Sequence, residues 1–161
     1  MKRMIPFSAV SILLLLTMTL DCFAYLIPIS NKELIRKSLD VIHGIVTEVR
    51  SDWNEDHSTI YTYVRIDVLQ VFKGEPRDEI VIQIPGGSLG NIGSEVEDTP
   101  HLREGMEVII HTFLKEDGYL WINGWERGVY DVSDGVIEQL NMTLDQFRNL
   151  VDEVSNQQEE E

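Results

Sequence analysis

The clearest pattern in the chain lies in residues 60–68, where apolar and polar side chains alternate. Every second residue belongs to a largely apolar face: Ile60, Thr62, Val64, Ile66 and Val68. The residues between them form a more polar face: Tyr61, Tyr63, Arg65 and Asp67. A period of two residues predicts a β-strand that is buried on one side. Past Val68 the apolar positions change phase to Leu69 and Val71, which predicts a β-bulge or a strong bend.

Other apolar segments predict further strands. They lie at residues 41–49, 80–84, 106–114, 119–123 and, as a short sixth candidate, 128–132. Gly44 falls inside the first of them, where a residue without a side chain lets a strand coil sharply, as small barrels require. Pro85 ends the segment at 80–84, because proline has no N–H group for a β-ladder. The pattern predicts a small closed or nearly closed barrel.

Helical patterns flank the strands. Glu33 follows Ser30 by three residues, and Gln146 follows Thr143 by three, which is the spacing of a capping box. The first box precedes a short apolar face, made of Leu34, Ile35 and Leu39. The second precedes an apolar stripe at helical spacing, made of Leu144, Phe147, Leu150, Val151 and Val154. We expect a short N-terminal helix, a C-terminal amphipathic helix that packs on the barrel, and a disordered acidic tail at 155–161.

Several short segments resemble known domains. Residues 38–46, SLDVIHGIV, resemble the first strand of netrin-like domains and tissue inhibitors of metalloproteinases, which are OB-fold barrels. IYT at 60–62, VFKG at 71–74, PGG at 85–87 and EGMEV at 104–108 resemble a group of exported bacterial domains of unknown function. The resemblance spans residues 33–132. It implies a mainly β fold: a small five- to six-stranded OB-like barrel with a short N-terminal helix and a C-terminal amphipathic helix.

The N-terminus has the layout of a secretory signal peptide. Basic residues at 2–3 precede an apolar stretch at 5–20, and small residues at Cys22 and Ala24 precede Tyr25. The stretch is shorter than the roughly 20 residues that a membrane-spanning helix needs. We therefore predict a signal peptide at 1–24, a single domain at 25–154 and a secreted or periplasmic protein without stable membrane insertion. A retained membrane anchor and a lipid on Cys22 are the alternatives.

Cleavage would change the chemistry of the chain. The mature chain would have 137 residues, no cysteine and a net charge of −16, from 11 basic and 27 acidic residues. Disulfides, cysteine-ligated zinc and thiol nucleophiles are then excluded, as is the cysteine-dependent mechanism of the metalloproteinase inhibitors. The negative charge repels nucleic acid and anionic lipid. We expect another exported or envelope protein as the partner, and no nucleic acid.

Four glycines follow the strand predicted at 80–84: Gly86, Gly87, Gly90 and Gly93. They match neither a P-loop nor a dinucleotide-binding motif. No lysine or arginine occurs between Arg77 and Arg103, whereas five acidic residues do, so a phosphate would meet like charge. Residues 85–103 show no clear regular pattern, and long segments of this kind are usually functional or disordered. The apolar residues Leu89 and Ile92 favour a mobile loop that contacts a partner, and a plain connection is the alternative.

The chain offers no recognisable catalytic, cofactor or metal motif. Its histidines, at positions 43, 57, 101 and 111, are scattered, and residues 52–56 imitate only the first half of a calcium loop. The sequence favours a non-enzymatic module that binds a protein through residues 85–103 or a face of the barrel. The candidate contact residues are Gly86, Gly87, Leu89, Ile92, Tyr61 and Tyr63.

Two other functions stay open. One is a small hydrolase, or an accessory part of one, that uses carboxylates and a histidine in a concave site. The other is binding of envelope glycans by exposed aromatic residues, which requires coplanar rings on an open face. The aromatic residues considered for it are Trp53, Tyr61, Tyr63, Trp121 and Trp125.

Overall fold

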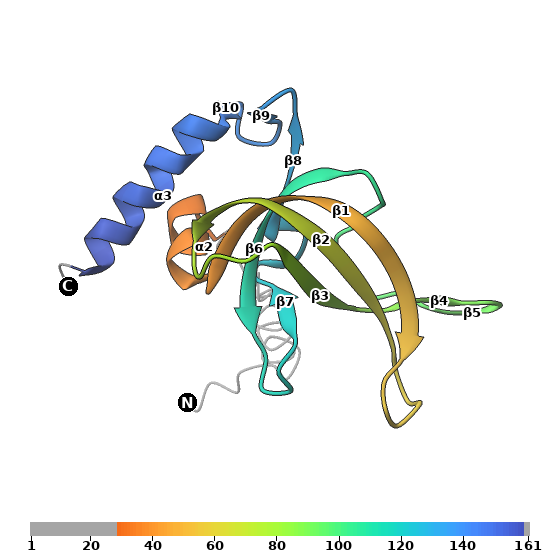
Figure 1. Ribbon diagram of the computed structural model, residues 1–161. Helices are drawn as coiled ribbons and strands as arrows, with labels where there is room; N and C mark the ends of the chain where they lie inside the picture. The colour runs from red at the N-terminus through yellow and green to blue at the C-terminus, as the bar shows by residue number, and fades with distance from the viewer. Residues whose placement is uncertain (1–28, 160–161) are drawn as a thin grey trace, which may run out of the picture.

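The structure is a computed structural model that describes residues 29–159 (Figure 1). The strands are β1 (Asp40–Trp53), β2 (Ile60–Lys73), β3 (Glu79–Pro85), β4 (Gly87–Leu89), β5 (Ile92–Ser94), β6 (Glu107–Leu114), β7 (Leu120–Ile122), β8 (Val129–Ser133), β9 (Val136–Ile137) and β10 (Met142–Thr143). The helices are α2 (Asn31–Lys37), the 3-10 turn η1 (Trp125–Gly128) and α3 (Leu144–Glu159). The predicted signal peptide at 1–24 and its cleavage site lie outside the described residues.

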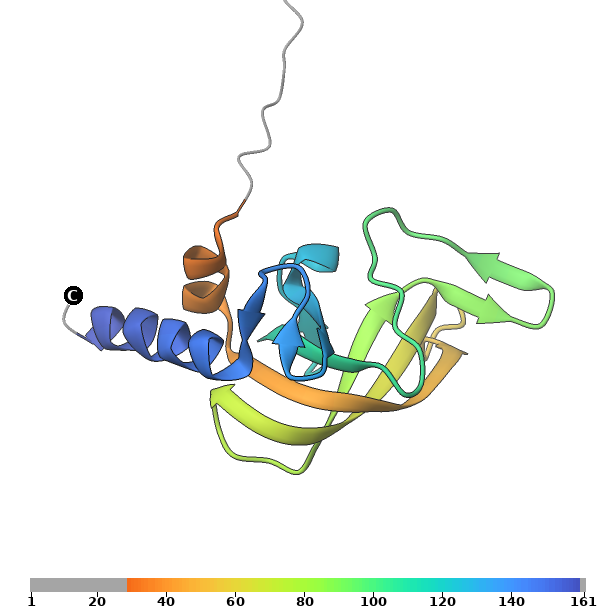
Figure 2. The same ribbon diagram turned by 90° about the horizontal axis from the view of Figure 1, so that it is seen from above.

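Five strands form a ring in the order β1–β2–β3–β7–β6, and β6 pairs back onto β1. Neighbouring strands are antiparallel except β3 and β7, which run parallel and meet at Ile82 and Leu120. The ring is barrel-like, which confirms the predicted mainly β, OB-like architecture with a short N-terminal and a C-terminal helix. Helices α2 and α3 lie at one end of the ring, and the β4–β5 hairpin projects at the other (Figure 2).

The first two strands bend where the sequence predicts it. His43 pairs with Gln70 and Gly44 with Val68, so Leu69 is an extra residue that forms a bulge. A Cβ atom on Gly44 would lie 2.5 Å from the backbone oxygen of Asp67, so glycine permits the close approach of the strands. Leu69 is 55% exposed, so the bulge turns this side chain outward and does not begin a second buried face.

The ring strands separate two hydrophobic cores. Alternate residues of β1 and β6 point in opposite directions, so Ile42 and Ile110 lie in the core inside the ring, whereas Val41 and Ile109 lie in a core outside it. Both helices contribute to the outer core, with Leu34 and Ile35 from α2 and Phe147, Val151 and Val154 from α3. The helices therefore cover one part of the outer sheet surface.

The predicted caps start both helices. Ser30 Oγ accepts a hydrogen bond from the backbone N–H of Glu33 at 3.2 Å. At α3 the box is reciprocal, because Thr143 Oγ1 accepts from Gln146 N at 3.2 Å and Gln146 Oε1 accepts from Thr143 N at 2.9 Å. Leu39 does not join the apolar face of the first helix as expected, because α2 ends at Lys37 and the Leu39 side chain is 48% exposed.

The C-terminal helix extends further than the sequence predicts. Residues 155–159, expected in a disordered tail, continue α3. Gln158 Nε2 donates to the backbone oxygen of Arg36 at 3.3 Å, and Lys73 Nζ donates to Gln158 Oε1 at 3.3 Å. These bonds hold the last turns against α2 and the end of β2. No helix within residues 29–159 is long and apolar enough to cross a membrane.

Candidate functional site

The glycine-rich segment forms a hairpin. Strands β4 and β5 pair antiparallel, with Leu89 opposite Ile92 beside the turn and Gly87 opposite Ser94 at the base. The expectation of a segment without regular structure is therefore wrong for residues 87–94. Each strand has three residues, which is too short for an alternating pattern to be visible in the sequence.

Gly87 allows the base of this hairpin to lie against β1 and β2. Its φ is +139°, and a Cβ atom there would lie within 2.5 Å of Thr62 Oγ1 and closer still to Ser51 Oγ. The backbone N–H of Ser88 donates to Ser51 Oγ at 3.2 Å, and Thr62 Oγ1 donates to the backbone oxygen of Gly86 at 2.8 Å. The paired glycines thus serve a close backbone approach, which accounts for them without a bound phosphate.

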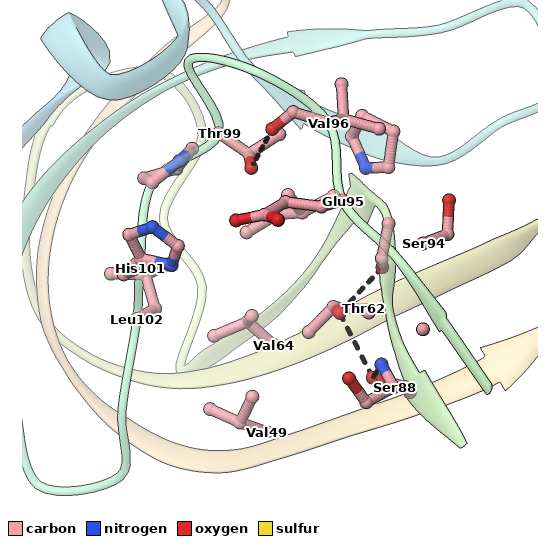
Figure 3. Close-up of a pocket in the computed structure, with 17 residues that line it drawn as sticks. Val49, Thr62, Val64, Ser88, Ser94, Glu95, Val96, Thr99, His101 and Leu102 are labelled. Atoms are coloured by element: carbon pink, nitrogen blue, oxygen red, sulfur yellow. Dashed lines mark hydrogen bonds between the residues drawn. The ribbon is translucent and has the colours of Figure 1, made fainter. Parts of the chain in front are cut away.

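A cavity of about 660 Å³ opens between the hairpin base, the ends of β1 to β3 and the stretch that follows β5 (Figure 3). Its apolar side is made of Val49, Val64, Ile84 and Leu102. Its polar side is made of Ser94, Glu95, Thr99 and His101. Figure 3 shows the Glu95 carboxylate pointing into the space between these two sides. Leu89 and Ile92, the predicted partner contacts, lie further out on the hairpin and do not line the cavity.

The cavity brings one carboxylate and one imidazole together, as the hydrolase alternative requires. Glu95 and His101 are both exposed, and neither forms a hydrogen bond or ion pair with another residue of the described chain. Thr99 is engaged elsewhere, because its hydroxyl donates to the backbone oxygen of Val96 at 2.7 Å. The described residues therefore contain no assembled pair of nucleophile and base at this cavity.

A second candidate surface lies on the outer side of the ring. Tyr61 packs against Trp121 at a centroid distance of 6.1 Å, and Tyr63 packs against Tyr119 at 5.8 Å. Phe113 lies 6.4 Å from Trp121 and pairs with it across β6 and β7. We call these five residues the aromatic face. Tyr61 and Tyr63 lie on the same face of β2, as the alternation predicts, and three aromatic residues join them from β6, β7 and the connection between these strands.

Polar contacts fix the aromatic rings. The buried side chain of Gln83 accepts a hydrogen bond from Trp121 Nε1 at 2.8 Å and donates to the Tyr63 hydroxyl at 3.3 Å. Lys115 Nζ lies 4.1 Å from the centroid of a Trp121 ring, and the Arg50 guanidinium lies 5.3 Å from that of Tyr63. Two cationic side chains therefore flank the aromatic face and contact its rings.

Strand β6 shows where the helices stop covering the sheet. His111, on the outer side of β6, is fully buried and packs against Tyr130 and Phe147. Phe113, two residues further along on the same side, is 37% exposed. The aromatic face therefore lies on the part of the outer sheet surface that the helices leave uncovered. The other tryptophans lie elsewhere, with Trp53 stacked on His57 and the exposed Trp125 in η1.

The buried histidine has an unusual environment. His111 Nδ1 lies 3.2 Å from the backbone oxygen of Gly128, and Nε2 has no hydrogen-bond partner among the described residues. Burial lowers the pKa of His111 to about 4, against an ordinary value of 6.5; the nearby Lys73 adds to the shift and the bond to Gly128 opposes it. The side chain is therefore neutral near pH 7 and acts as part of the outer core.

The remaining polar candidates serve local structure. His43 Nε2 lies 2.8 Å from Glu107 Oε1 across β1 and β6. In residues 52–56, which imitate half of a calcium loop, Asn54 Oδ1 accepts hydrogen bonds from the backbone N–H groups of Ser58 and Thr59 at 2.8 and 3.0 Å. Asn54 therefore closes the loop between β1 and β2. Residues 29–159 contain no group of three or more histidine, cysteine, aspartate or glutamate side chains that could hold a metal ion.

No protein-family model matches the chain, and no curated protein matches it. The similarity of residues 38–46 to netrin-like domains stays a prediction.

Proposed function

We propose that the chain is an exported, non-enzymatic module that binds a protein through the aromatic face. The observation that carries the proposal is the gathering of five aromatic side chains on the uncovered outer surface of the ring. Tyrosine, tryptophan and arginine are the residue types most enriched in protein interfaces and in their energetically dominant positions. The basic and apolar N-terminal sequence that precedes Tyr25 supports export.

The rings are positioned before a partner arrives. Gln83 bonds both Tyr63 and Trp121, and Lys115 packs on the Trp121 ring, so these side chains have few alternative rotamers to lose on binding. Preorganisation of this kind raises affinity because less conformational entropy is lost. Tyr119 is 42% exposed, which is the largest exposed fraction among the five residues of the aromatic face, so a partner can bury much of its ring.

The ring geometry disfavours the glycan alternative. The planes of Tyr61 and Trp121 meet at 64°, and those of Tyr63 and Tyr119 meet at 59°. Flat stacking of a sugar across either pair needs nearly coplanar rings. A protein surface, which offers side chains of many shapes, fits tilted rings better.

Charge disfavours a nucleic-acid strand on the same face. Lys115 Nζ lies 3.0 Å from Asp117 Oδ2, and Arg50 Nη1 lies 3.6 Å from Asp52 Oδ2. The cations are thus largely neutralised by neighbours, on a chain whose net charge is −15. A phosphate backbone requires an excess of positive charge, which this face does not supply.

Site-specific photo-crosslinking tests the proposal. A photoreactive phenylalanine analogue at Tyr119 should crosslink one partner in an extract of the native envelope, whereas the same analogue at Leu69 should not. Leu69 is a suitable control because it is also exposed on the ring but lies outside the aromatic face. In quantitative binding to that partner, Tyr119→Ser should weaken affinity about tenfold or more, which corresponds to about 1.4 kcal/mol. Equal crosslinking from both positions would contradict the proposal.

A further inference from the structure

The cavity is a second site, separate from the aromatic face. Thr62 and Val64 line it from β2, whereas Tyr61 and Tyr63 of the same strand point to the opposite side of the sheet. Its volume of about 660 Å³ lies within the range of roughly 300–1,000 Å³ that is usual for ligand pockets. A ligand there would not compete directly with a partner on the aromatic face.

The inner side of the cavity is suited to an apolar chain. Ile84 and Leu102 belong to the core inside the ring, Val49 packs against this core and is only partly buried, and all three line the cavity. The two hydroxyl groups on this side, Ser51 and Thr62, already bond the base of the hairpin. The aliphatic side chains on this side therefore offer a contact for the alkyl stem of a ligand.

The opposite side of the cavity carries negative charge. Glu95 lines the cavity and also an adjoining pocket of about 430 Å³. Three further carboxylates line that pocket: Glu97, Asp98 and Glu126. Within residues 29–159, no lysine or arginine lines either space. A cation is attracted along this approach and an anion is repelled.

We infer that this cavity binds an alkyl chain that ends in an ammonium or guanidinium group. The cation contacts the Glu95 carboxylate, and the alkyl stem lies on Val49, Ile84 and Leu102. The Glu95 carboxylate is available for this contact because it has no ion-pair or hydrogen-bond partner among the described residues. Two sources supply such a group, a free alkylamine and a lysine or arginine side chain of a protein.

Chemical-shift titration of the full chain tests the inference with three probes of equal length: n-pentylammonium, 1-pentanol and pentanoate. The ammonium should bind at least tenfold more tightly than the alcohol, and pentanoate should not bind. The affected amide resonances should belong to the cavity, including those of Gly87, Glu95 and Leu102. Equal affinity for ammonium and alcohol, or shifts confined to other parts of the chain, would overturn the inference.

A matched pair of variants separates a local contact from the general negative field. Glu95→Gln should reduce ammonium affinity to the level of the alcohol. Glu97→Gln removes the same charge two residues away, from a side chain that does not line the cavity, and should change affinity less than threefold. Equal losses in the two variants would show that no specific contact exists at Glu95, and the inference would fail.

A blocked Ala-Lys-Ala peptide distinguishes the two sources. Tighter binding of the peptide than of n-pentylammonium supports the inference with a protein side chain as the source, and tighter binding of the free amine supports it with a small molecule. The Tyr119→Ser variant should bind both probes as the unaltered chain does, because Tyr119 lies on the other side of the sheet. Loss of probe binding at the cavity can therefore be told apart from loss of partner binding at the aromatic face.

Discussion

Gly87 shows how one residue shapes the cavity. Only a residue without Cβ can hold φ at +139° while its Cα lies against Ser51 and Thr62. The sequence singles out this glycine but does not reveal its role, because the two hydroxyl groups it touches lie on strands far away along the chain. The sequence prediction that the segment binds no phosphate rests on the local charges, whereas the packing role of Gly87 follows only from the fold.

Gly87→Ala should therefore lower the free energy of unfolding by about 2 kcal/mol or more, from backbone strain and steric overlap together. Gly93→Ala is the matched control, since its backbone does not need a positive φ and the nearest atom to a new Cβ, Ser88 Oγ, lies 3.6 Å away. Urea unfolding of both variants checks the difference. Equal stability of the two would show that the hairpin base does not press on β1 and β2.

The buried His111 side chain should make the free energy of unfolding depend on pH. In the folded chain its pKa is about 4, whereas in the unfolded chain it returns to about 6.5, so between these values the unfolded state binds the additional proton. Stability from this residue is complete above pH 6.5 and is lost as the pH falls towards 4, by about 3 kcal/mol at most. His111→Leu should flatten the decrease measured by urea unfolding between these pH values. His57→Gln, which removes an exposed histidine, should leave the decrease intact, and an unchanged decrease in His111→Leu would refute the assignment.

Among the elements, those with a strong local signal agree best with the sequence. β2 alternates over its first half, and α3 begins with a capping box whose two hydrogen bonds are both formed. The β4–β5 hairpin has no such signal, because its strands have three residues each and contain glycine. The parallel pairing of β3 with β7, which helps to close the ring, depends on distant residues and has no local signature either.

The loop between β2 and β3 is held by an ion pair between the half-buried Arg77 and a buried aspartate, which the sequence does not indicate. Asp40, at the start of β1, is 1% exposed; it accepts hydrogen bonds from Arg77 Nη2 at 3.2 Å and from Thr112 Oγ1 at 3.1 Å. Gly74 fits against the same carboxylate, because a Cβ atom there would overlap it. The loop, the start of β1 and the end of β6 are thereby joined at one point.

Arg77→Ala should destabilise the fold by about 3 kcal/mol, because it leaves the Asp40 carboxylate buried without its cation. Arg36→Ala is the control, since Arg36 pairs with Glu33 on the surface of α2 and such pairs contribute about 1 kcal/mol or less. Urea unfolding measures both values. A loss below 1 kcal/mol for Arg77→Ala would mean that the loop is not held by this pair.

At the scale of the molecule, the candidate sites depend on how the ring closes. The outward position of Tyr61 and Tyr63 follows from alternation along one strand, and the sequence predicts it correctly. Their grouping with Phe113, Tyr119 and Trp121 follows from the pairing of β6 and β7 in the closed ring, which no local pattern specifies. The cavity likewise joins the ends of three strands to residues 93–102. Single strands are therefore easier to predict than the surfaces they form together.

The two cores should unfold together, because β1 and β6 contribute to both. Phe147 of α3 is fully buried in the outer core against Phe72, Tyr130 and His111. Phe147→Ala should lower the free energy of unfolding by about 3–5 kcal/mol through lost burial and the cavity it leaves. Phe113→Ala, the same change at a partly exposed position of the aromatic face, should cost clearly less.

Because Val41 and Ile109 in the outer core alternate with Ile42 and Ile110 in the inner core, loss of the outer core should propagate directly to the ring. Urea unfolding of Phe147→Ala, followed by far-UV circular dichroism and by tryptophan fluorescence, should give one coincident transition at a lower midpoint. Trp121 lies on the aromatic face, away from α3, so its fluorescence reports on the unfolding of the ring. The additional substitution Trp121→Phe should remove this signal and thereby verify its origin. Two separated transitions would show that the helices and outer core unfold independently of the ring.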